Sequence, residues 1–396
     1  TGQDVPETGL VFDEGDRDML LWPVPGSMVR VPWASVPTAQ YIATVHDLDG
    51  TPHYADPRNA LEKIVKRFEL ELGMKPVGAV ELEFFLMDRA SAMAGKPMAP
   101  QSLINEARPQ HYQAYYLQDT EDFAPFFKDL YAMCEIQGLP AKTLISEYAP
   151  GQYELTLHYR EDVMQAADDL MRLKRIVRAQ ARAHGVTACF MAKPVEEYAG
   201  SGMHFHVSML DDDGRNVFVE ETEGEWNETL LHALGGLRVT MGEAMLVFAP
   251  HANSWRRFSS QSYAPVSPSW GVNNRSVALR VPAGSKQARR IEHRPSGVDA
   301  NPYLVAATVL AGIRHGLEGR IDPGPETTGN GYEGDDTLSV PRDWNEAIAA
   351  ATKSDFLKDA LGVDMHRTFT AIAAAEYDRV MRTVSEVDFD LYLHSV

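Results

Sequence analysis

Strict alternation of apolar and polar residues behind two glycines is the feature that most constrains the fold. The stretch reads Gly200-Ser201-Gly202-Met203-His204-Phe205-His206-Val207-Ser208. Successive side chains of a strand point to opposite faces, so one face is apolar and the other carries His204, His206 and Ser208. Two imidazoles on one face suit a divalent cation. The stretch therefore predicts a strand that holds a metal site or, in the simpler alternative, a half-exposed face of hydrogen-bonded histidines.

A second predicted strand carries two carboxylates on one face. Residues 77–87 alternate as well, with Val80, Leu82 and Phe84 on one side and Glu81 and Glu83 on the other. Two carboxylates this close repel each other and lose hydration on burial unless a cation lies beside them. A solvated edge strand explains the pattern equally well when it is taken alone.

Three further segments repeat this arrangement of charged strand faces. Their polar positions hold Glu147 and Glu154, then Arg275 and Arg280, then Arg290, Glu292 and Arg294. If all these strands form one curved antiparallel sheet, their polar faces line a single cavity. Its Glu and His side chains would hold two or three hard cations, and oxygen-rich ligation favours Mg²⁺ or Mn²⁺ over Zn²⁺.

The basic residues beside these carboxylates point to phosphoryl transfer. Arg and Lys side chains can hold phosphates and a carboxylate substrate, and metal ions with a cationic clamp are the equipment of that chemistry. The sequence has neither a Walker-type glycine loop nor a Rossmann fingerprint. ATP is therefore expected to bind on the sheet itself.

Composition narrows the range of partners. The 396 residues are 44% hydrophobic and 23% charged, with a net charge of -19. Such a chain repels phosphate, which argues against nucleic acid or an anionic membrane surface as the main partner. Cys134 and Cys189 lie far apart, so no disulfide framework is indicated and a reducing cytoplasm is favoured. No run reads as long and apolar enough to span a bilayer, and no signal-peptide pattern opens the chain.

Proline and glycine positions predict two parts of unequal size. Residues 1–56 are rich in Pro, Gly and short β-type runs, which predicts a small β-rich unit. Asp56-Pro57 is typical of a helix start and Gly73 of a helix end, so residues 57–396 form the larger part. Further helices are expected over about 124–137, 161–184, 226–248 and 302–319, and a helical pattern continues from residue 341.

Taken together, these segments resemble the glutamine synthetase superfamily along nearly the whole chain. The motifs that carry the resemblance are Glu81-Leu82-Glu83-Phe84-Phe85, Glu147 through Gly151-Gln152-Tyr153-Glu154, the histidine stretch, Asn253-Ser254-Trp255-Arg256-Arg257, Asn274-Arg275-Ser276, Arg289-Arg290-Ile291-Glu292 and Asn301-Pro302-Tyr303-Leu304. The resemblance implies an α+β fold. Residues 1–56 would be part of a β-grasp domain, and residues 57–396 a catalytic domain with a curved antiparallel sheet flanked by helices. It also implies a homo-oligomer, a dodecamer of two stacked hexamers with active sites between neighbours.

The resemblance also implies roles for individual residues. It places one metal at Glu83, Glu147 and Glu154, and a second at Glu81, His204 and Glu292. Gly200, Arg257 and Arg294 would bind glutamate, with Tyr263 at the flap over the site. Arg275, Arg280 and Lys286 would face the phosphates, with Arg290 along the same wall, and Tyr159, His206 and Ser208 would contact the nucleotide. The residues implied in catalysis are Arg275, Arg257 and Glu292.

The implied reaction has two steps, and the sequence departs from glutamine synthetases at the second. Glutamate attacks the γ-phosphate of ATP to give γ-glutamyl phosphate, and an amine then displaces phosphate. Glutamine synthetases carry an Asn where this chain has Ala199, and a flap Glu that serves ammonium where this chain has Tyr263 before Ala264-Pro265. A neutral Tyr supplies no carboxylate charge at neutral pH. The family's early ammonium-binding Asp is expected upstream of Thr1.

These departures favour the branch of the superfamily that makes γ-glutamylpolyamines and related γ-glutamylamides. The first hypothesis is an ATP-dependent ligase that joins glutamate to putrescine or another polyamine or alkylamine. A glutamine synthetase that uses ammonia is the alternative among enzymes. The other classes are a non-catalytic structural relative and a relative that phosphorylates a guanidino group. The complete set of metal-ligand positions argues against a non-catalytic relative. The pair Arg257 and Arg294, which would bind glutamate, argues against a relative that phosphorylates a guanidino group.

Overall fold

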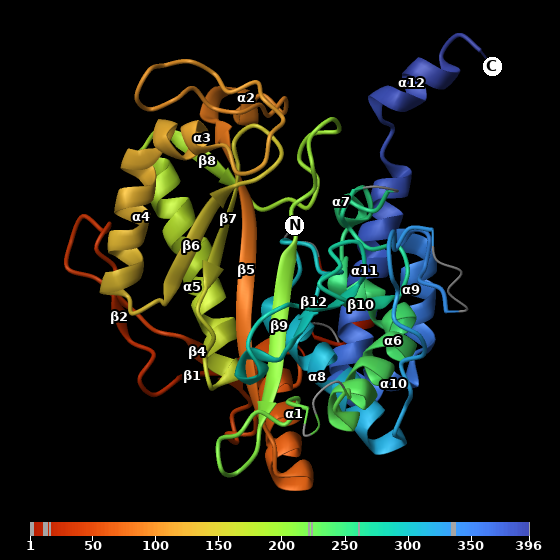
Figure 1. Cartoon of the computed structure of the whole chain (residues 1–396). Coiled ribbons are helices and arrows are strands. Elements are labelled where there is room, and N and C mark those ends of the chain that lie inside the picture. The colour runs from red at the N-terminus through yellow and green to blue at the C-terminus, as the bar shows by residue number, and fades with distance from the viewer. Residues whose placement is uncertain are drawn as a thin grey trace.

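The computed structural model describes residues 4–10, 15, 17–220, 222, 225–259, 262–333 and 338–395. In this part of the chain an eight-stranded sheet has the order β10-β11-β12-β9-β5-β7-β6, and β8 pairs with β5 off this path (Figure 1). The strands of this sheet are β5 (Lys75–Asp88), β6 (Ala141–Ser146), β7 (Gln152–Leu157), β8 (Val186–Cys189), β9 (Met203–Leu210), β10 (Trp270–Val272), β11 (Leu279–Val281) and β12 (Ile291–His293).

The long strand β5 organises the sheet. It pairs antiparallel with β9 along its first half and with β8 near its end, and β7 runs antiparallel beside residues 81–85. The predicted antiparallel sheet has one exception, because β10 and β11 pair in parallel. The strand expected from Ser276 is also shorter than predicted and begins at Leu279. The Asn274 side chain accepts a hydrogen bond from the Ser276 backbone and holds a turn there.

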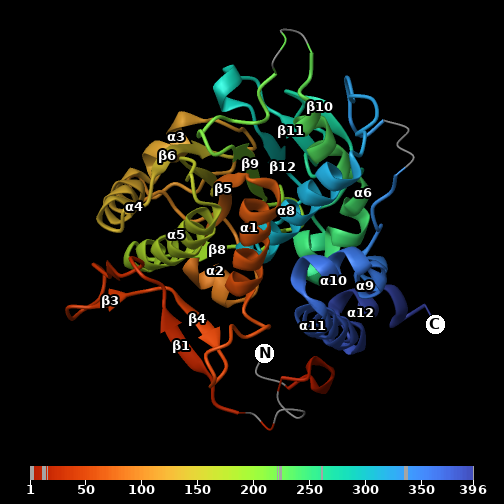
Figure 2. The same ribbon diagram turned by 90° about the horizontal axis from the view of Figure 1, so that it is seen from below.

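Helices cover the apolar side of the sheet and pack on one another (Figures 1 and 2). They are α1 (Pro57–Leu72), α2 (Arg89–Met93), α3 (Leu117–Asp122), α4 (Ala124–Ile136), α5 (Val163–Ala183), α6 (Glu228–Phe248), α7 (Ala252–Trp255), α8 (Pro302–Gly319), α9 (Trp344–Lys353), α10 (Asp355–Leu361), α11 (Val363–Arg382) and α12 (Glu386–Tyr392). One hydrophobic core joins Leu82 and Phe84 of β5 to Leu170 and Leu173 of α5. The face of β5 that was predicted to be apolar is therefore buried, and its opposite face remains for chemistry.

The capping residues predicted for both ends of α1 are confirmed. The Asp56 side chain accepts a hydrogen bond from the Arg58 backbone at 2.9 Å, Pro57 opens the helix, and Gly73 ends it with φ of 60°. At α8, Asn301 caps the backbone of Tyr303 and Leu304. Short polar side chains just before a proline thus fix these helix starts locally.

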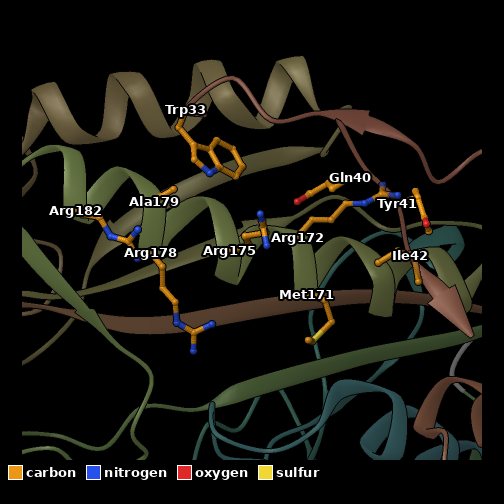
Figure 3. Close-up of a pocket in the computed structure, with 10 residues that line it drawn as sticks. All are labelled: Trp33, Gln40, Tyr41, Ile42, Met171, Arg172, Arg175, Arg178, Ala179 and Arg182. Carbon is orange, nitrogen blue, oxygen red and sulfur yellow. The ribbon is translucent and has the colours of Figure 1, made fainter. Parts of the chain in front are cut away.

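The N-terminal segment forms two small antiparallel sheets. β1 (Leu20–Pro23) pairs with β4 (Ala43–His46), and β2 (Val29–Arg30) pairs with β3 (Ala39–Gln40). This segment and α5 line a groove of about 570 Å³ that contains none of the predicted site residues (Figure 3). Its lining includes Trp33 and Tyr41 from the segment and Arg172, Arg175, Arg178 and Arg182 from α5.

Helix α6 corrects one expectation from the sequence. Among the described residues it is the one helix long and apolar enough to cross a membrane by length and composition, with a mean hydropathy of 1.2. Two thirds of that window is buried inside the protein, and α6 packs along α8. Gly236 of α6 approaches Gly316 of α8 so closely that an added Cβ would lie 2.4 Å from its backbone nitrogen. The helix is strongly apolar because most of its surface packs in the core.

Candidate active site

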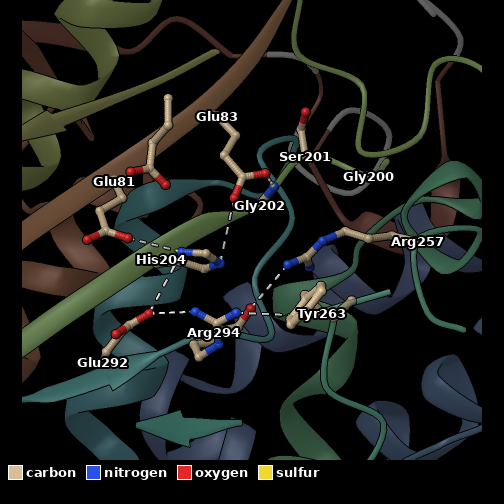
Figure 4. A network of polar contacts seen from close by, with 12 residues as sticks. Glu81, Glu83, Gly200, Ser201, Gly202, His204, Arg257, Tyr263, Glu292 and Arg294 are labelled. Carbon is tan, nitrogen blue, oxygen red and sulfur yellow. Dashed lines mark hydrogen bonds and ion pairs between the residues drawn. The ribbon is translucent and has the colours of Figure 1, made fainter. Parts of the chain in front are cut away.

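Strand register brings the predicted carboxylates and imidazoles together on the face of the sheet opposite the main core. Glu81 lies directly opposite His204, Glu83 opposite Glu154, and Glu292 opposite His206. Side chains at directly opposed positions of antiparallel strands point the same way and lie within contact distance. Figure 4 shows Glu81, Glu83 and Glu292 around His204.

Glu81 is held between the two histidines. Its Oε2 lies 3.1 Å from His204 Nδ1, and its Oε1 lies 2.9 Å from His206 Nε2. Burial favours the neutral acid, but attraction to His206 and hydrogen bonding by both imidazoles outweigh it. The pKa of Glu81 is therefore held well below its ordinary value, and the group is a carboxylate at neutral pH.

Glu292 is also a compensated carboxylate. It is buried, yet Arg280 Nη1 donates to its Oε2 at 2.7 Å and Arg294 Nη1 donates to its Oε1 at 2.6 Å. Burial acts to raise its pKa, but the His206 ring and the Arg294 guanidinium prevail and lower the value to about 2. Two charge-assisted hydrogen bonds therefore fix both oxygens of one buried carboxylate.

Glu147 and Glu154 are in the opposite electrostatic state. Burial raises the pKa of Glu147 to about 8, and repulsion from Glu83 adds to the shift although Arg275 opposes it. Burial and repulsion from Glu81 and Glu83 raise the pKa of Glu154 well above its ordinary value. These two carboxyl groups therefore lack the positive charge that would let them ionise easily.

Two glycines bring the backbone close to these side chains. The Gly202 nitrogen donates to Glu83 Oε2 at 2.6 Å, and an added Cβ would lie 2.8 Å from Arg257 Nη2. At Gly200 an added Cβ would lie 2.6 Å from Arg257 Cγ. The absence of side chains at both positions lets the arginine reach the face that carries the carboxylates.

The predicted glutamate-binding residues form one wall beside this cluster. Arg257 is buried and donates to the backbone carbonyls of Pro295 and Arg294. Arg294 Nη2 donates to the Tyr263 carbonyl at 3.2 Å. The Tyr263 ring is 66% exposed and its φ is +58°, which is uncommon for a bulky residue. The Tyr263 backbone thus contacts the arginine wall, whereas its ring faces solvent.

The predicted phosphate and nucleotide residues are less tightly grouped. Arg290 Nε donates to His206 Nδ1 at 3.1 Å, and Arg280 spans Glu292 and Asn273. Ser208 lies opposite Val77 farther along β9, while Arg275 and Tyr159 are exposed. Lys286 is exposed too, and its ammonium lies 3.6 Å from Glu220. The structure therefore brings Arg280 and Arg290 to the cluster and leaves Lys286 beside a different acid.

The donor set fits hard divalent cations. Ligand atoms of Glu81, Glu154 and His204 all lie within 4.8 Å of one another, as do those of Glu81, His206 and Glu292. His206 accepts a hydrogen bond at Nδ1, so the neutral ring carries its proton on Nε2 and has no free lone pair there. His204 can instead direct Nδ1–H to Glu81 and leave Nε2 for a metal. Oxygen-rich sets of this kind suit Mg²⁺ or Mn²⁺.

Sequence reasoning left two residues of this region without a role. Gln152 Nε2 donates to the Gly200 carbonyl at 2.9 Å and to Ser201 Oγ at 3.2 Å, so it ties β7 to the glycine turn. Tyr332 donates its hydroxyl to the Ala264 carbonyl and lies near Arg294. Alternation in the segment before Glu154 places Gln152 on the polar face, whereas no sequence signal identifies Tyr332.

Known proteins match this geometry and sequence. The family described as glutamine synthetase, catalytic domain, matches residues 54–392. The chain is 38% identical over 394 residues to γ-glutamylputrescine synthetase of Escherichia coli strain K12, a match that covers 99% of this chain and 82% of the relative. It is 33% identical over 338 residues to a glutamate–isopropylamine ligase of a Pseudomonas species, with 84% and 72% covered.

Among solved structures, a complex of GmaS with ADP is similar, with a TM-score of 0.86, 27% sequence identity, and coverage of 97% of this chain and 87% of that one. The paired carboxylate strands, the histidine strand and the arginine wall therefore lie in a shared fold, and the chain belongs to the glutamine synthetase family.

Proposed function

We propose that this protein is an ATP-dependent ligase that joins the γ-carboxyl group of L-glutamate to an amine. The observation that carries the proposal is the convergence of four strand Glu side chains and His204 on one sheet face, with Glu147 next to Glu83 and with Arg257 and Arg294 beside the cluster. Relatives named as γ-glutamylputrescine synthetase and glutamate–isopropylamine ligase support the reaction class. In the first step a glutamate γ-carboxylate oxygen attacks the terminal phosphorus of ATP and ADP leaves. In the second the amine nitrogen attacks the acyl carbon, phosphate leaves, and the nitrogen loses a proton.

Six side chains would hold the divalent cations, whether Mg²⁺ or Mn²⁺ and two or three in number. One set is Glu83, Glu147 and Glu154, and the other is Glu81, His204 and Glu292. Bound cations would neutralise phosphate charge during transfer. Glu83 and Glu154 face each other across β5 and β7, and the raised pKa of Glu154 marks a place where positive charge is missing.

The arginines are proposed to position the two anionic substrates. Arg257 and Arg294 would bind the glutamate carboxylates beside Gly200, and Arg275 and Arg280 would face the phosphates. Arg290, Tyr159, His206 and Ser208 would line the nucleotide site, and Lys286 would join them only if it leaves Glu220. We propose that the catalytic residues are Arg275, Arg257 and Glu292.

An organic amine is favoured over ammonia because of Tyr263. Its exposed ring stands where glutamine synthetases carry a carboxylate, and a phenol supplies no negative charge at neutral pH. Putrescine or another polyamine or alkylamine is the preferred acceptor. The alternative is a glutamine synthetase that uses ammonia, which the family assignment also supports. Tyr263→Glu should improve the use of ammonia relative to large amines, and Tyr41→Ala, a change at another exposed tyrosine, serves as the control.

The direct test is phosphate release from ATP with Mg²⁺ and L-glutamate. Ammonia, methylamine, isopropylamine, ethanolamine, putrescine and spermidine are compared as acceptors. Rates with an organic amine well above the rate with ammonia support the proposal. A rate with ammonia alone favours glutamine synthesis, and no rate with any acceptor while ATP still binds favours a non-catalytic relative.

A homo-oligomer, a dodecamer of two stacked hexamers, is the proposed assembly. Figure 1 shows α12 standing away from the body of the subunit. Its region exposes the apolar side chains of Val384, Val387, Phe389, Leu391 and Leu393. Exposed apolar side chains gathered in one segment are typical of an interaction surface. Light scattering should give the mass of twelve chains, and a monomer at micromolar concentration would contradict the proposal.

Two further predictions concern organisation and location. We propose the division at residue 56 into a partial β-grasp domain and a catalytic domain, and α1 begins at the next residue. We also propose a cytoplasmic location, because the reaction consumes ATP and glutamate. Limited proteolysis near residue 56 and fractionation of cells test these two statements separately.

A further inference from the structure

A short loop, residues 262–264, lies directly on the arginine wall. Arg294 joins it to the carboxylate cluster, because its Nη1 donates to Glu292 Oε1 at 2.6 Å and its Nη2 donates to the Tyr263 carbonyl at 3.2 Å. Figure 4 shows Tyr263 beside Arg294. Ala264 is buried, whereas the Tyr263 ring is exposed. The loop therefore has a buried anchor at the edge of the candidate active site.

The next carbonyl of this loop is bound from a distant segment. Tyr332 donates its hydroxyl to the Ala264 carbonyl at 3.1 Å. Burial raises the pKa of the Tyr332 phenol above its ordinary value, although the nearby charges of Arg294 and Arg257 oppose the shift. The phenol therefore keeps its proton at neutral pH and can donate it to the carbonyl. Two adjacent loop carbonyls are thus bound by side chains from two different segments.

The segment that carries Tyr332 has a support of its own outside the loop. The Gly331 nitrogen donates to Ser276 Oγ at 2.8 Å, and Ser276 Oγ donates to Asn274 Oδ1 at 2.7 Å. A Cβ added at Gly331 would lie only 2.8 Å from the Ser276 carbonyl oxygen, so the two segments are in close contact. The turn between Asn274 and Ser276 also carries Arg275. Tyr332 is therefore placed by this turn, and its hydroxyl can hold the loop.

The proposed reaction passes through an intermediate that water can destroy. γ-Glutamyl phosphate is an acyl phosphate. Attack of a water oxygen on its acyl carbon would release phosphate, return glutamate and give up a proton to solvent, and no amide would form. Active sites limit such side reactions when a loop excludes water from the reacting centre. The 262–264 loop lies at the wall proposed to hold glutamate, so its position affects this competition.

We propose that Tyr332 is a positioning residue that holds the 262–264 loop on the arginine wall and thereby favours attack on the acyl phosphate by the amine over attack by water. This inference rests on the proposed ligase function and adds to it a residue without an assigned role. Tyr332 acts through the loop, because its hydroxyl is bound to the Ala264 carbonyl. A tyrosine that only stabilised the fold would change the unfolding temperature and leave the division between the two nucleophiles unaltered.

The experiment measures how the acyl phosphate is divided between an amine and water. Hydroxylamine serves as the amine, because it traps an acyl phosphate as a hydroxamate whatever the natural acceptor is. Reactions with ATP, L-glutamate and Mg²⁺ are run in water enriched in a heavy oxygen isotope and are followed at initial rates. Label that enters glutamate counts attack of water on the acyl carbon, whereas direct hydrolysis of ATP would place the label in phosphate.

Two variants and one control are compared with the wild type. Tyr332→Phe removes only the hydroxyl, and Tyr332→Ala removes the ring as well. Tyr131→Phe is the matched control, because the Tyr131 hydroxyl also donates to a backbone carbonyl, that of Lys142 in β6 at the edge of the sheet. KM for ATP and thermal unfolding are measured for each protein.

The ratio of labelled glutamate to hydroxamate should rise roughly fivefold in Tyr332→Phe, because the net worth of one hydrogen bond corresponds to a change of about that size in the share of loop held on the wall. Tyr332→Ala should raise the ratio at least as much. KM for ATP should change less than about twofold in Tyr332→Phe, since the contact with Ser276 beside Arg275 is kept. Tyr131→Phe should match the wild type. These results support the inference.

The ways in which the inference can fail are distinguishable. If Tyr332→Phe gives the wild-type ratio, with or without a lower unfolding temperature, the tyrosine is only a structural contact and the inference is wrong. Extra label in phosphate alone would show direct hydrolysis of ATP and would also contradict it. If the wild type yields neither hydroxamate nor labelled glutamate while ATP still binds, no acyl phosphate forms, and the ligase function proposed above is wrong together with the inference.

Discussion

The two halves of the carboxylate cluster differ in how their charge is balanced. Glu81 and Glu292 are surrounded by imidazoles and guanidinium groups, and the pKa of each lies below its ordinary value. Glu147 and Glu154 are surrounded mainly by other carboxylates, and the pKa of each lies above its ordinary value. Glu292 is buried, the other three are partly buried, and all four lie at the same face of the sheet. Burial alone therefore does not decide the protonation state, and the neighbouring cations do.

The two halves therefore differ in whether they need a bound cation for charge balance. The compensated half is charge-balanced by protein groups before any cation binds, because Arg280 and Arg294 bind both oxygens of Glu292. The uncompensated half needs an added cation to ionise fully at neutral pH. Substitutions in the first half should therefore destabilise the protein, and substitutions in the second should mainly weaken metal binding.

The largest effect is expected for Glu292→Gln. Removal of this charge leaves Arg280 and Arg294 without their carboxylate, and breaking a buried ion pair costs about 3 to 5 kcal/mol of unfolding free energy. Phosphate release with glutamate and amine should be abolished. Denaturant unfolding and the phosphate assay measure the two effects. Near-normal turnover would contradict the role of Glu292 as a metal ligand.

A large effect is also expected from pH on the metal-free protein. The pKa of Glu147 is about 8 in the folded protein against an ordinary value of 4.5, so the folded state holds a proton that the unfolded state has lost. Its contribution to stability is present below pH 4.5 and is lost as pH rises to about 8. Each unit of difference corresponds to about 1.4 kcal/mol, so the loss amounts to a few kcal/mol.

The unfolding free energy, measured in the presence of a chelator between pH 5 and 9, gives the slope of stability against pH. Glu147→Gln should flatten it, whereas Glu135→Gln, a change at an exposed carboxylate of α4, should leave it unchanged. An identical slope in wild type and Glu147→Gln would show that the uncompensated half is balanced by a group other than a metal.

A smaller effect is expected on adding Mg²⁺ at neutral pH. A ligand that binds only the folded state stabilises it by about 2.7 kcal/mol at a concentration of 100 times Kd. Glu154→Gln should lose most of this gain, because it removes a carboxylate opposite Glu83. Asp212→Asn, in an exposed turn, should keep it. Equal Mg²⁺ stabilisation of all three proteins would place the metal elsewhere.

The smallest effect is expected at the edge of the compensated half. Arg290→Ala removes the hydrogen bond to His206 Nδ1, which is worth about 1 kcal/mol. KM for ATP should rise roughly fivefold with little change in KM for glutamate. A rise confined to glutamate would move His206 out of the nucleotide site.

Much of this arrangement follows from local patterns in the sequence. Alternation predicted the faces of β5 and β9, and the caps at Asp56 and Asn301 predicted two helix starts. The family prediction and the fold of the catalytic domain are confirmed. The individual site roles stay predictions. The parallel pairing of β10 and β11 escaped prediction, because pairing direction depends on the path of the chain between strands and leaves no pattern within either one.

The sequence by itself determined which side chains share a strand face, because a period of two is a property of every extended chain. It therefore determined the family, and it predicted the metal-binding residues and the preference for an organic amine implied by Tyr263. Only the tertiary structure decided which carboxylates are balanced by cations, since register and burial set those distances. It also decided that Tyr198 stacks on Phe85 and that Tyr112 lies between Tyr198 and Tyr148. Contacts between residues far apart in sequence arise from packing, and no local periodicity encodes them.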